Sequence, residues 1–245
     1  MFVKTYLRSN LMRPNLQDYK QVQTIAKTVL EEIKSFIGAD KTEKDIAREC
    51  AALLKKHGIT KTWYYACPAL VLLGSRSCLS ISGKIYEPSD EKVGSENLVT
   101  IDLSPLSNKI WGDCSRSFVV ESGKVKSEGE IKNQEFVEGL KVERELHSLF
   151  INCARPGKTF EEVFLQMNQA IKARGYENLD FNGNVGHTIE TEKDKRLYFE
   201  SGNKETLKEN ALFTFEPHIR KIGKNYGFKL ENIYYFDEDG STREL

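Results

Sequence analysis

The sequence is poor in the residues on which small metal-binding and secreted domains usually depend. It has four histidines and five cysteines among 245 residues, and the cysteines show no CxxC or zinc-ribbon spacing. An odd number of cysteines without such spacing favours a reducing compartment over a disulfide framework. A structural zinc site built on cysteine is therefore not expected.

Long apolar runs and an excess of one charge are also lacking. No apolar run approaches the ~20 residues that a membrane span needs, and the start has no apolar core of a signal peptide. Lys plus Arg and Asp plus Glu both number 36, so the formal net charge is zero. No basic excess points to nucleic acid or to a membrane surface. We expect a soluble cytoplasmic globular protein with neither kind of partner.

The carboxylates occur in an unusual pattern of two pairs, and the first pair lies in residues 98–120. Two apolar, β-branched runs flank a turn that contains Ser107 and Asn108, which predicts a β-hairpin. Asp102 and Asp113 lie equally far from the midpoint of that turn. If the hairpin closes there, the two carboxylates are cross-strand neighbours with Cβ atoms roughly 5 Å apart. Like charges in that position destabilise a strand pair, so the pattern predicts a bound cation.

A second carboxylate pair occurs in residues 211–236. Glu216 and Glu231 are symmetric about the midpoint of residues 223 and 224, and His187 lies in another β-like run. Four carboxylates and one imidazole suit a pair of divalent ions of manganese, iron, cobalt or zinc better than calcium. For any one of these residues an exposed position on an edge strand is the simpler interpretation. The five together favour a metal site.

Helical periodicity and capping signals predict four helices, over residues 16–36, 42–58, 133–153 and 159–175. Residues 64–73 are apolar and strand-like. The order is two helices, strands with the Asp pair, two helices, then strands with His187 and the Glu pair. This is an approximate internal duplication, and two halves folded face to face would bring the hairpins together at one site. No Pro/Gly/Ser linker separates the halves, so we expect a single α+β domain over residues 1–245.

Five motifs in this order resemble the superfamily of methionine aminopeptidase, aminopeptidase P, prolidase and creatinase. The segments are LVTIDLSPLSNKIWGDCSRSF, VGHTI, FTFEP and GFKLENIYYF, followed by a terminal acidic-glycine turn in DEDGSTREL. They are most similar to the aminopeptidase P and prolidase branch. The resemblance implies the pita-bread fold, with two pseudo-symmetric halves of antiparallel strands covered by helices. It also leads us to expect that the N-terminal domain of that branch is missing.

The resemblance implies a role for each of the five predicted ligands. Asp102 would chelate one ion, Asp113 and Glu231 would bridge two ions, and His187 and Glu216 would hold the second. Glu216 would also shuttle the proton to the leaving amine. The implied activity is that of a dinuclear metal-dependent exopeptidase, an aminopeptidase or Xaa-Pro dipeptidase acting on a short peptide. The implied cofactors are two ions of Mn, Co, Fe or Zn, and a homodimer is compatible with the family.

The chain departs from the family at two histidines. One is expected on a strand before Asp102, where this chain reads SCLSISG, and the other seven residues after His187, where Asp194 stands. Four side chains are candidates to replace them: Arg76, Ser80, Ser82 and His218. The losses raise an alternative, a weak or inactive pita-bread domain that binds a peptide or protein partner. Because such modules usually lose metal ligands as well, the five retained ligands favour an enzyme. Hydrolysis of a non-peptide C–N bond, as in creatinase, is a third and less favoured possibility.

Other candidates have simpler explanations. His57 precedes Gly58 at a predicted helix end, where a positive charge is favourable. His147 lies within the third predicted helix and is expected at the surface or in packing. Cys114 is expected to point into the core, because strand alternation turns it away from Asp113. Arg116 is expected to orient the carboxylates.

Overall fold

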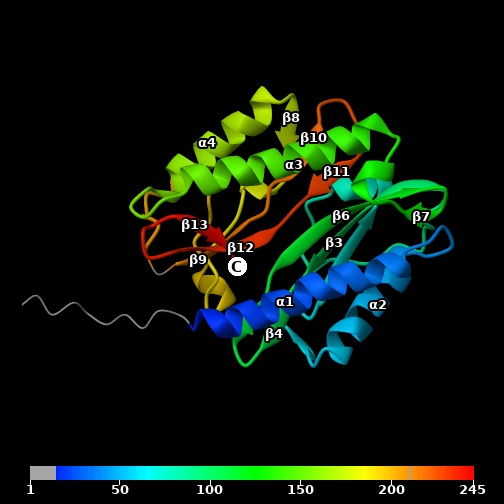
Figure 1. Ribbon diagram of the computed structural model, residues 1–245, viewed down its shortest axis with the longest axis horizontal. Coiled ribbons are helices and arrows are strands. Elements are labelled where there is room, and N and C mark those ends of the chain that lie inside the picture. Colours follow the sequence, from blue (N-terminus) through cyan, green and yellow to red (C-terminus); the bar gives the residue numbers. More distant parts are fainter. Residues whose placement is uncertain (1–14, 210) are drawn as a thin grey trace, which may run out of the picture.

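Figure 1 shows the computed structural model, which describes residues 15–209 and 211–245. The N-terminal half contains, in chain order, α1 (Leu16–Glu32), η1 (Ile33–Ser35), α2 (Glu43–Lys56), β1 (Lys61–Thr62), β2 (Ala69–Leu73), η2 (Gly74–Cys78), β3 (Glu96–Leu103), β4 (Pro105–Ser107), β5 (Ile110–Trp111), β6 (Cys114–Glu121) and β7 (Lys124–Val125). The C-terminal half contains η3 (Glu128–Glu130), α3 (Gln134–Cys153), α4 (Phe160–Ala173), β8 (Tyr176–Asn178), η4 (Phe181–Gly183), η5 (Lys193–Lys195), β9 (Leu212–Phe215), β10 (His218–Lys221), β11 (Gly227–Lys229), β12 (Asn232–Phe236) and β13 (Thr242–Glu244). The predicted duplication of two helices followed by strands is confirmed.

The four helices begin where their capping residues predict. Thr42 and Asp45 form a capping box at the start of α2, and Thr159 and Glu162 form another at the start of α4. Each satisfies backbone N–H groups that would otherwise lack partners, which is worth about 1 kcal/mol per cap. The α2 helix ends before Gly58, whose φ of 85° reverses the chain direction.

The first half is built on the antiparallel sheet β2-β3-β6-β7. In the β3–β6 pair, Asp102 lies opposite Ser115 and not opposite Asp113, so the predicted register is wrong by two residues. The cause is the turn, which is centred on Asn108 and Lys109, both with positive φ (47° and 69°). Two-residue turns of this kind match the right-handed twist of the flanking strands. Asp113 therefore becomes a diagonal neighbour of Asp102 on the same face.

The second half contains two three-stranded sheets, in the orders β13-β12-β9 and β11-β10-β8. Phe215 pairs with Asn232, and His218 pairs with Lys229. Both pairs belong to the register predicted from the symmetry of the two glutamates. That prediction is confirmed, and Glu216 and Glu231 face each other at the break between the two strand pairs.

Two segments predicted as strands are not regular strands. Residues 64–68 form a turn in which Tyr65 and Ala66 have positive φ, so β2 is shorter than predicted. The run around His187 forms isolated bridges instead of a strand, from His187 to Tyr198 and from Thr188 to Phe213, and the Thr214 N–H donates to the His187 carbonyl oxygen at 2.7 Å. An irregular segment docked against β9 thus carries the histidine.

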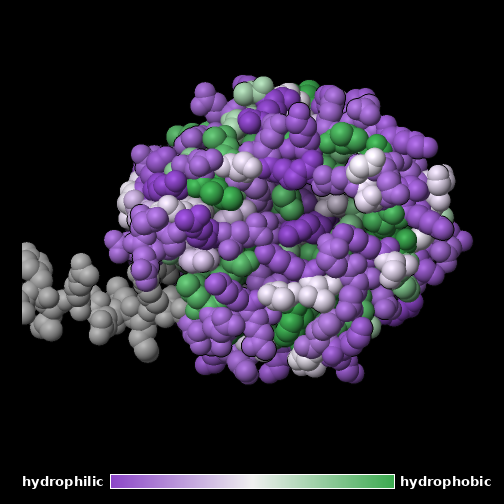
Figure 2. Space-filling view, in the orientation of Figure 1, coloured by the Kyte–Doolittle hydropathy of each residue, from purple (hydrophilic) through white to green (hydrophobic). Residues whose placement is uncertain are grey.

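Each half has its own hydrophobic core between helices and sheet, and the halves join through their strands. In Figure 1, α1 and α2 lie on one side of the strands and α3 and α4 on the other. Ser115 and Glu231 exchange backbone hydrogen bonds of 3.0 and 3.4 Å across the junction. The face seen in Figure 2 is mainly hydrophilic with separate apolar patches. Within residues 15–209 and 211–245, every helix is too short or too polar to cross a membrane.

Candidate metal centre

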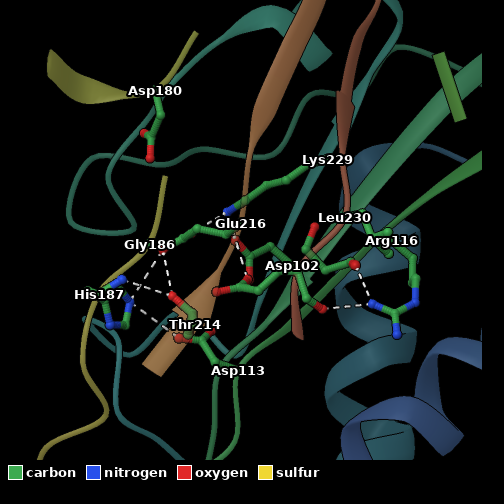
Figure 3. Close-up of polar contacts among 12 residues, drawn as sticks. Asp102, Asp113, Arg116, Asp180, Gly186, His187, Thr214, Glu216, Lys229 and Leu230 are labelled. Atoms are coloured by element: carbon green, nitrogen blue, oxygen red, sulfur yellow. Dashed lines mark hydrogen bonds and ion pairs between the residues drawn. The ribbon is translucent and has the colours of Figure 1, made fainter. Parts of the chain in front are cut away.

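The five predicted ligands come together where the two halves join, and Figure 3 labels four of them: Asp102, Asp113, His187 and Glu216. Asp102 lies near the end of β3, Asp113 immediately before β6, Glu216 after β9 and Glu231 before β12. One ligand atom from each of Asp113, His187 and Glu231 lies within 4.8 Å of the other two. The halves thus contribute to one cluster, as the duplication predicted.

Asp113 and Glu231 are buried carboxylates with unused oxygen atoms. Their exposed fractions are 3% and 1%. Within the described part of the chain, Asp113 Oδ2 and both carboxylate oxygens of Glu231 accept no hydrogen bond. Burial raises the pKa of both groups well above the usual range, and nearby carboxylates raise it further. A buried anion without partners is costly, so these oxygens fit a bound cation.

His187 presents a free nitrogen lone pair to the same cluster. Its Nδ1 lies 2.9 Å from the carbonyl oxygen of Thr188, which can only accept, so Nδ1 carries the proton. Nε2 then faces Asp113 Oδ2 and Glu216 Oε1, each at 3.5 Å. Burial lowers the pKa of His187 to about 4, so the ring is neutral at pH 7. A neutral imidazole whose other nitrogen donates to a carbonyl is the usual form of a metal-ligating histidine.

Glycine is required beside this histidine. Gly186 has a φ of 149°, and a Cβ atom built there would lie 2.3 Å from the carbonyl oxygen of Thr214. The backbone can therefore approach β9 closely enough for His187 N–H to donate to Thr214 Oγ1, at 3.0 Å. The Thr214 hydroxyl in turn donates to Glu216 Oε1, at 3.2 Å. One threonine thus positions two of the predicted ligands.

Arg116 holds the opposite side of the cluster through the backbone. Its guanidinium donates to the carbonyl oxygens of Ser115 and Glu231, each at 2.7 Å, and to Asn232 Oδ1 at 2.8 Å. It therefore fixes the chain that carries Glu231, and so acts on that carboxylate through the backbone.

Lys229 is a residue of the cluster that sequence reasoning missed. Its Nζ lies 2.6 Å from Asp102 Oδ2, 3.1 Å from Glu216 Oε2 and 3.9 Å from Glu231 Oε2. Burial alone would lower the pKa of Lys229, but the surrounding carboxylates outweigh it and raise the pKa well above its usual value. Strand alternation was the available signal, because Lys229 stands two residues before Glu231 and so points to the same face.

A cavity of about 650 Å³ opens beside the carboxylates. Aromatic side chains of Trp63, Tyr64 and Tyr198 line it, and the Arg196 guanidinium lies over the Trp63 and Tyr198 rings, at 5.0 and 5.2 Å from their centroids. The three consecutive aromatic residues 63–65 thus form part of the cavity wall. Its size suits a small ligand such as a short peptide.

The four candidate replacements for the missing histidines differ in position. Ser80, Ser82 and His218 line the cavity, whereas Arg76 pairs with Glu43 at 2.8 Å. The His218 Nε2–H donates to the carbonyl oxygen of Ser77 at 2.6 Å, and burial lowers the pKa of His218 to about 4. Ser80 donates to Asp180 Oδ1 at 2.8 Å. The hydrogen atoms of His218 and Ser80 are therefore already engaged.

The remaining side chains singled out in the sequence lie outside the cluster. His57 pairs with Glu32 at 3.0 Å at the end of α2, and Cys114 is fully buried in the core, as expected. His147 is buried between Tyr234 Oη, at 2.6 Å, and the Leu230 carbonyl oxygen, at 2.9 Å. His147 is therefore a packing residue, which was one of the two alternatives expected from the sequence.

These features define a candidate metal centre shared by two similar half-domains. The family model "Metallopeptidase family M24" matches residues 17–238, and the chain belongs to this family. It is 27% identical over 226 residues to the Xaa-Pro dipeptidase of Pyrococcus furiosus, covering 91% of this chain and 59% of that protein. The chain thus spans about three fifths of the length of that relative.

Solved structures of the same superfamily share the fold. The prolidase of Pyrococcus horikoshii OT3 superposes with a TM-score of 0.78 at 23% identity, covering 94% of this chain and 60% of that chain. A methionine aminopeptidase from Rickettsia prowazekii gives a TM-score of 0.70 at 15% identity, covering 94% and 95%. The predicted α+β pita-bread fold and the resemblance to this superfamily are confirmed.

Proposed function

We propose that this chain is a metal-dependent exopeptidase that cleaves a peptide bond near the N-terminus of a short peptide. The observation that carries the proposal is the convergence of Asp113, His187 and Glu231, with buried carboxylate oxygens and a neutral imidazole lone pair. The aromatic cavity beside them supplies room for the peptide. Similarity to an Xaa-Pro dipeptidase makes dipeptides that end in proline the first substrates to test.

The donor set favours manganese, cobalt, iron or zinc, because it combines carboxylates with one imidazole. Such an ion, when bound, supplies Lewis-acid polarisation of the peptide carbonyl and lowers the pKa of a water molecule. The dinuclear form implied by the family resemblance needs Asp102 and Glu216 in addition to the triad. Lys229 contacts both of these carboxylates.

Glu216 is the proposed general base and acid. Burial would raise its pKa, but Lys229 and His187 outweigh burial and lower it, so the carboxylate is ionised at neutral pH. An ionised carboxylate beside the reacting water can take its proton and deliver it to the leaving amine. Thr214 holds the Oε1 side of that carboxylate by its hydroxyl.

Metal loading and dipeptide hydrolysis test the proposal together. Protein loaded with Mn²⁺ or Co²⁺ should release amino acids from a dipeptide panel that includes Xaa-Pro, and Asp113→Ala should abolish both metal retention and release. Asp90→Asn, an exposed carboxylate paired with Lys44 at 3.5 Å, is the matched control and should keep both. Wild-type protein that retains no metal would overturn the proposal.

A second candidate function is a peptide-binding domain with weak or no catalysis. The specific observation in its favour is that the hydrogen atoms of His218 and Ser80 are committed to Ser77 and Asp180. With their hydrogen atoms engaged in this way, neither His218 nor Ser80 could donate a hydrogen bond to the oxyanion of a peptide transition state. Peptide binding to the metal-loaded protein without turnover would support this function.

Three further expectations stay predictions. They are a single catalytic domain over residues 1–245, a cytoplasmic location, and a homodimer as a compatible assembly.

A further inference from the structure

We propose that the Lys229 ammonium is the resident cation of the Asp102–Glu216 side of the centre, so that the protein retains one divalent ion and not two. The ion would be held by Asp113, His187 and Glu231. This inference rests on the metal centre proposed above and specifies its composition.

The contacts of Lys229 are those of a bound cation. Its Nζ donates to Asp102 Oδ2 at 2.6 Å and lies 3.1 Å from Glu216 Oε2. The side chain is only 17% exposed, so water screens these charges poorly. Figure 3 shows the amino group directed toward Glu216 and Asp102. The ammonium thus occupies the space between these two oxygens and takes one lone pair of Asp102 Oδ2, so that it neutralises charge that a second ion would otherwise neutralise.

The backbone fixes Lys229 in this position. Its N–H donates to Ser117 Oγ at 2.9 Å, and its carbonyl oxygen accepts from the same hydroxyl at 3.0 Å. It also pairs with His218 in the β10–β11 ladder. Only the side chain is free to move, and the cavity is the space into which it would have to withdraw.

The two sides of the centre therefore differ. Asp113 Oδ2 and the Glu231 oxygens accept no hydrogen bond within the described residues, whereas Asp102 Oδ2 does accept one. Lys229 Nζ lies 3.9 Å from Glu231 Oε2, beyond hydrogen-bonding range. With four ionised carboxylates and one ammonium, one divalent ion leaves a net charge of −1, whereas a second divalent ion would make it +1 and place three cations beside one another in a buried cluster.

Metal stoichiometry tests the inference without any assay of activity. The full chain is stripped with chelator, loaded with Mn²⁺ alone, passed through a desalting column and measured by elemental analysis, with a parallel calorimetric titration. Wild type should retain about one ion per chain, and Lys229→Met should retain about two. Lys229→Arg is the matched control, because it keeps the positive charge, and it should retain about one.

Asp102→Asn makes the test independent of whether Lys229→Met folds. If Asp102 serves Lys229 and not the ion, this variant should change the affinity for the first Mn²⁺ by less than about threefold, whereas loss of a true ligand costs far more. A loss of Mn²⁺ retention in Asp102→Asn would overturn the inference. Two ions of similar affinity in wild type would also overturn it while leaving the proposed function intact. Absence of any retained ion would overturn the proposed metal centre itself.

Discussion

Gln23, buried in α1, satisfies both backbone hydrogen-bonding groups of Asp113. Its Nε2 donates to the Asp113 carbonyl oxygen at 2.7 Å, and its Oε1 accepts from the Asp113 N–H at 2.9 Å. Asp113 stands in the non-regular residues just before β6, where no ladder partner is available to it. A helix side chain thus substitutes for a neighbouring strand at a predicted metal ligand.

Replacing Gln23 should therefore affect both folding and the metal centre. Gln23→Leu leaves a buried N–H and a buried C=O without partners, at an expected cost on the order of 2 to 4 kcal/mol in the free energy of unfolding. The measurement is urea denaturation of metal-free protein, followed by Mn²⁺ titration. Gln21→Leu, at an exposed position of the same helix, is the control and should stay within about 0.5 kcal/mol of wild type. Equal stability of the two variants would contradict the structural role of Gln23.

Gly186→Ala should displace His187. The new Cβ would collide with the Thr214 carbonyl oxygen, so the segment must move away from β9. We expect destabilisation of roughly 3 kcal/mol or more and weaker Mn²⁺ binding. Gly202→Ala is the matched control, because Gly202 also has a positive φ (87°) but nothing lies within 4 Å of a Cβ there. Unchanged Mn²⁺ affinity in Gly186→Ala would show that the close contact does not position the histidine.

Acid should destabilise the fold through His147. Burial lowers the pKa of this histidine from 6.5 to about 3, so between these values the unfolded chain binds a proton that the folded chain excludes. The stabilisation is fully present above pH 6.5 and is lost as the pH falls from there toward 3. Urea denaturation between pH 7.5 and 5 should show this decline, with a shallower slope in His147→Phe. An equal slope in wild type and variant would argue against a buried neutral His147.

Chelation should lower the thermal stability of the metal-loaded protein. A ligand that binds only the folded state at 100 times its Kd adds about 2.7 kcal/mol, and removing it subtracts the same amount. We expect Mn²⁺ to raise the Tm of wild type, EDTA to reverse the rise, and His187→Ala to show neither change. A metal-induced rise in Tm that persists in His187→Ala would place the bound ion elsewhere on the chain.

The fold could be predicted from sequence where the signals are local. The capping boxes at Thr42 and Thr159 marked helix starts because their hydrogen bonds span only three residues. The Glu216–Glu231 register could be predicted because the two glutamates are equally far from the midpoint of the turn between their strands. The register of Asp102 could not, because it depends on Lys109 adopting a positive φ, which its side chain does not favour.

The candidate site was predictable in its ligands but not in their surroundings. Acidic residues and a histidine are recognisable as possible metal ligands from their type alone. The roles of Gln23 and Lys229 depend on their position in the folded structure and cannot be recognised from their residue type. Lys229 meets Asp102 from 127 residues away along the chain. Such contacts follow from how the halves pack, and no spacing rule within one segment encodes them.

The junction at Ser115 and Glu231 makes the centre a joint product of the two halves. Asp113 belongs to the first half and His187 and Glu231 to the second, so a polypeptide cut between β7 and α3 would leave each fragment with an incomplete donor set. An ion bound there would act as a cross-link, and metal concentration would then control how firmly two separately synthesised fragments reassemble. In this duplicated architecture, the free energy of metal binding would therefore stabilise the association of the two halves.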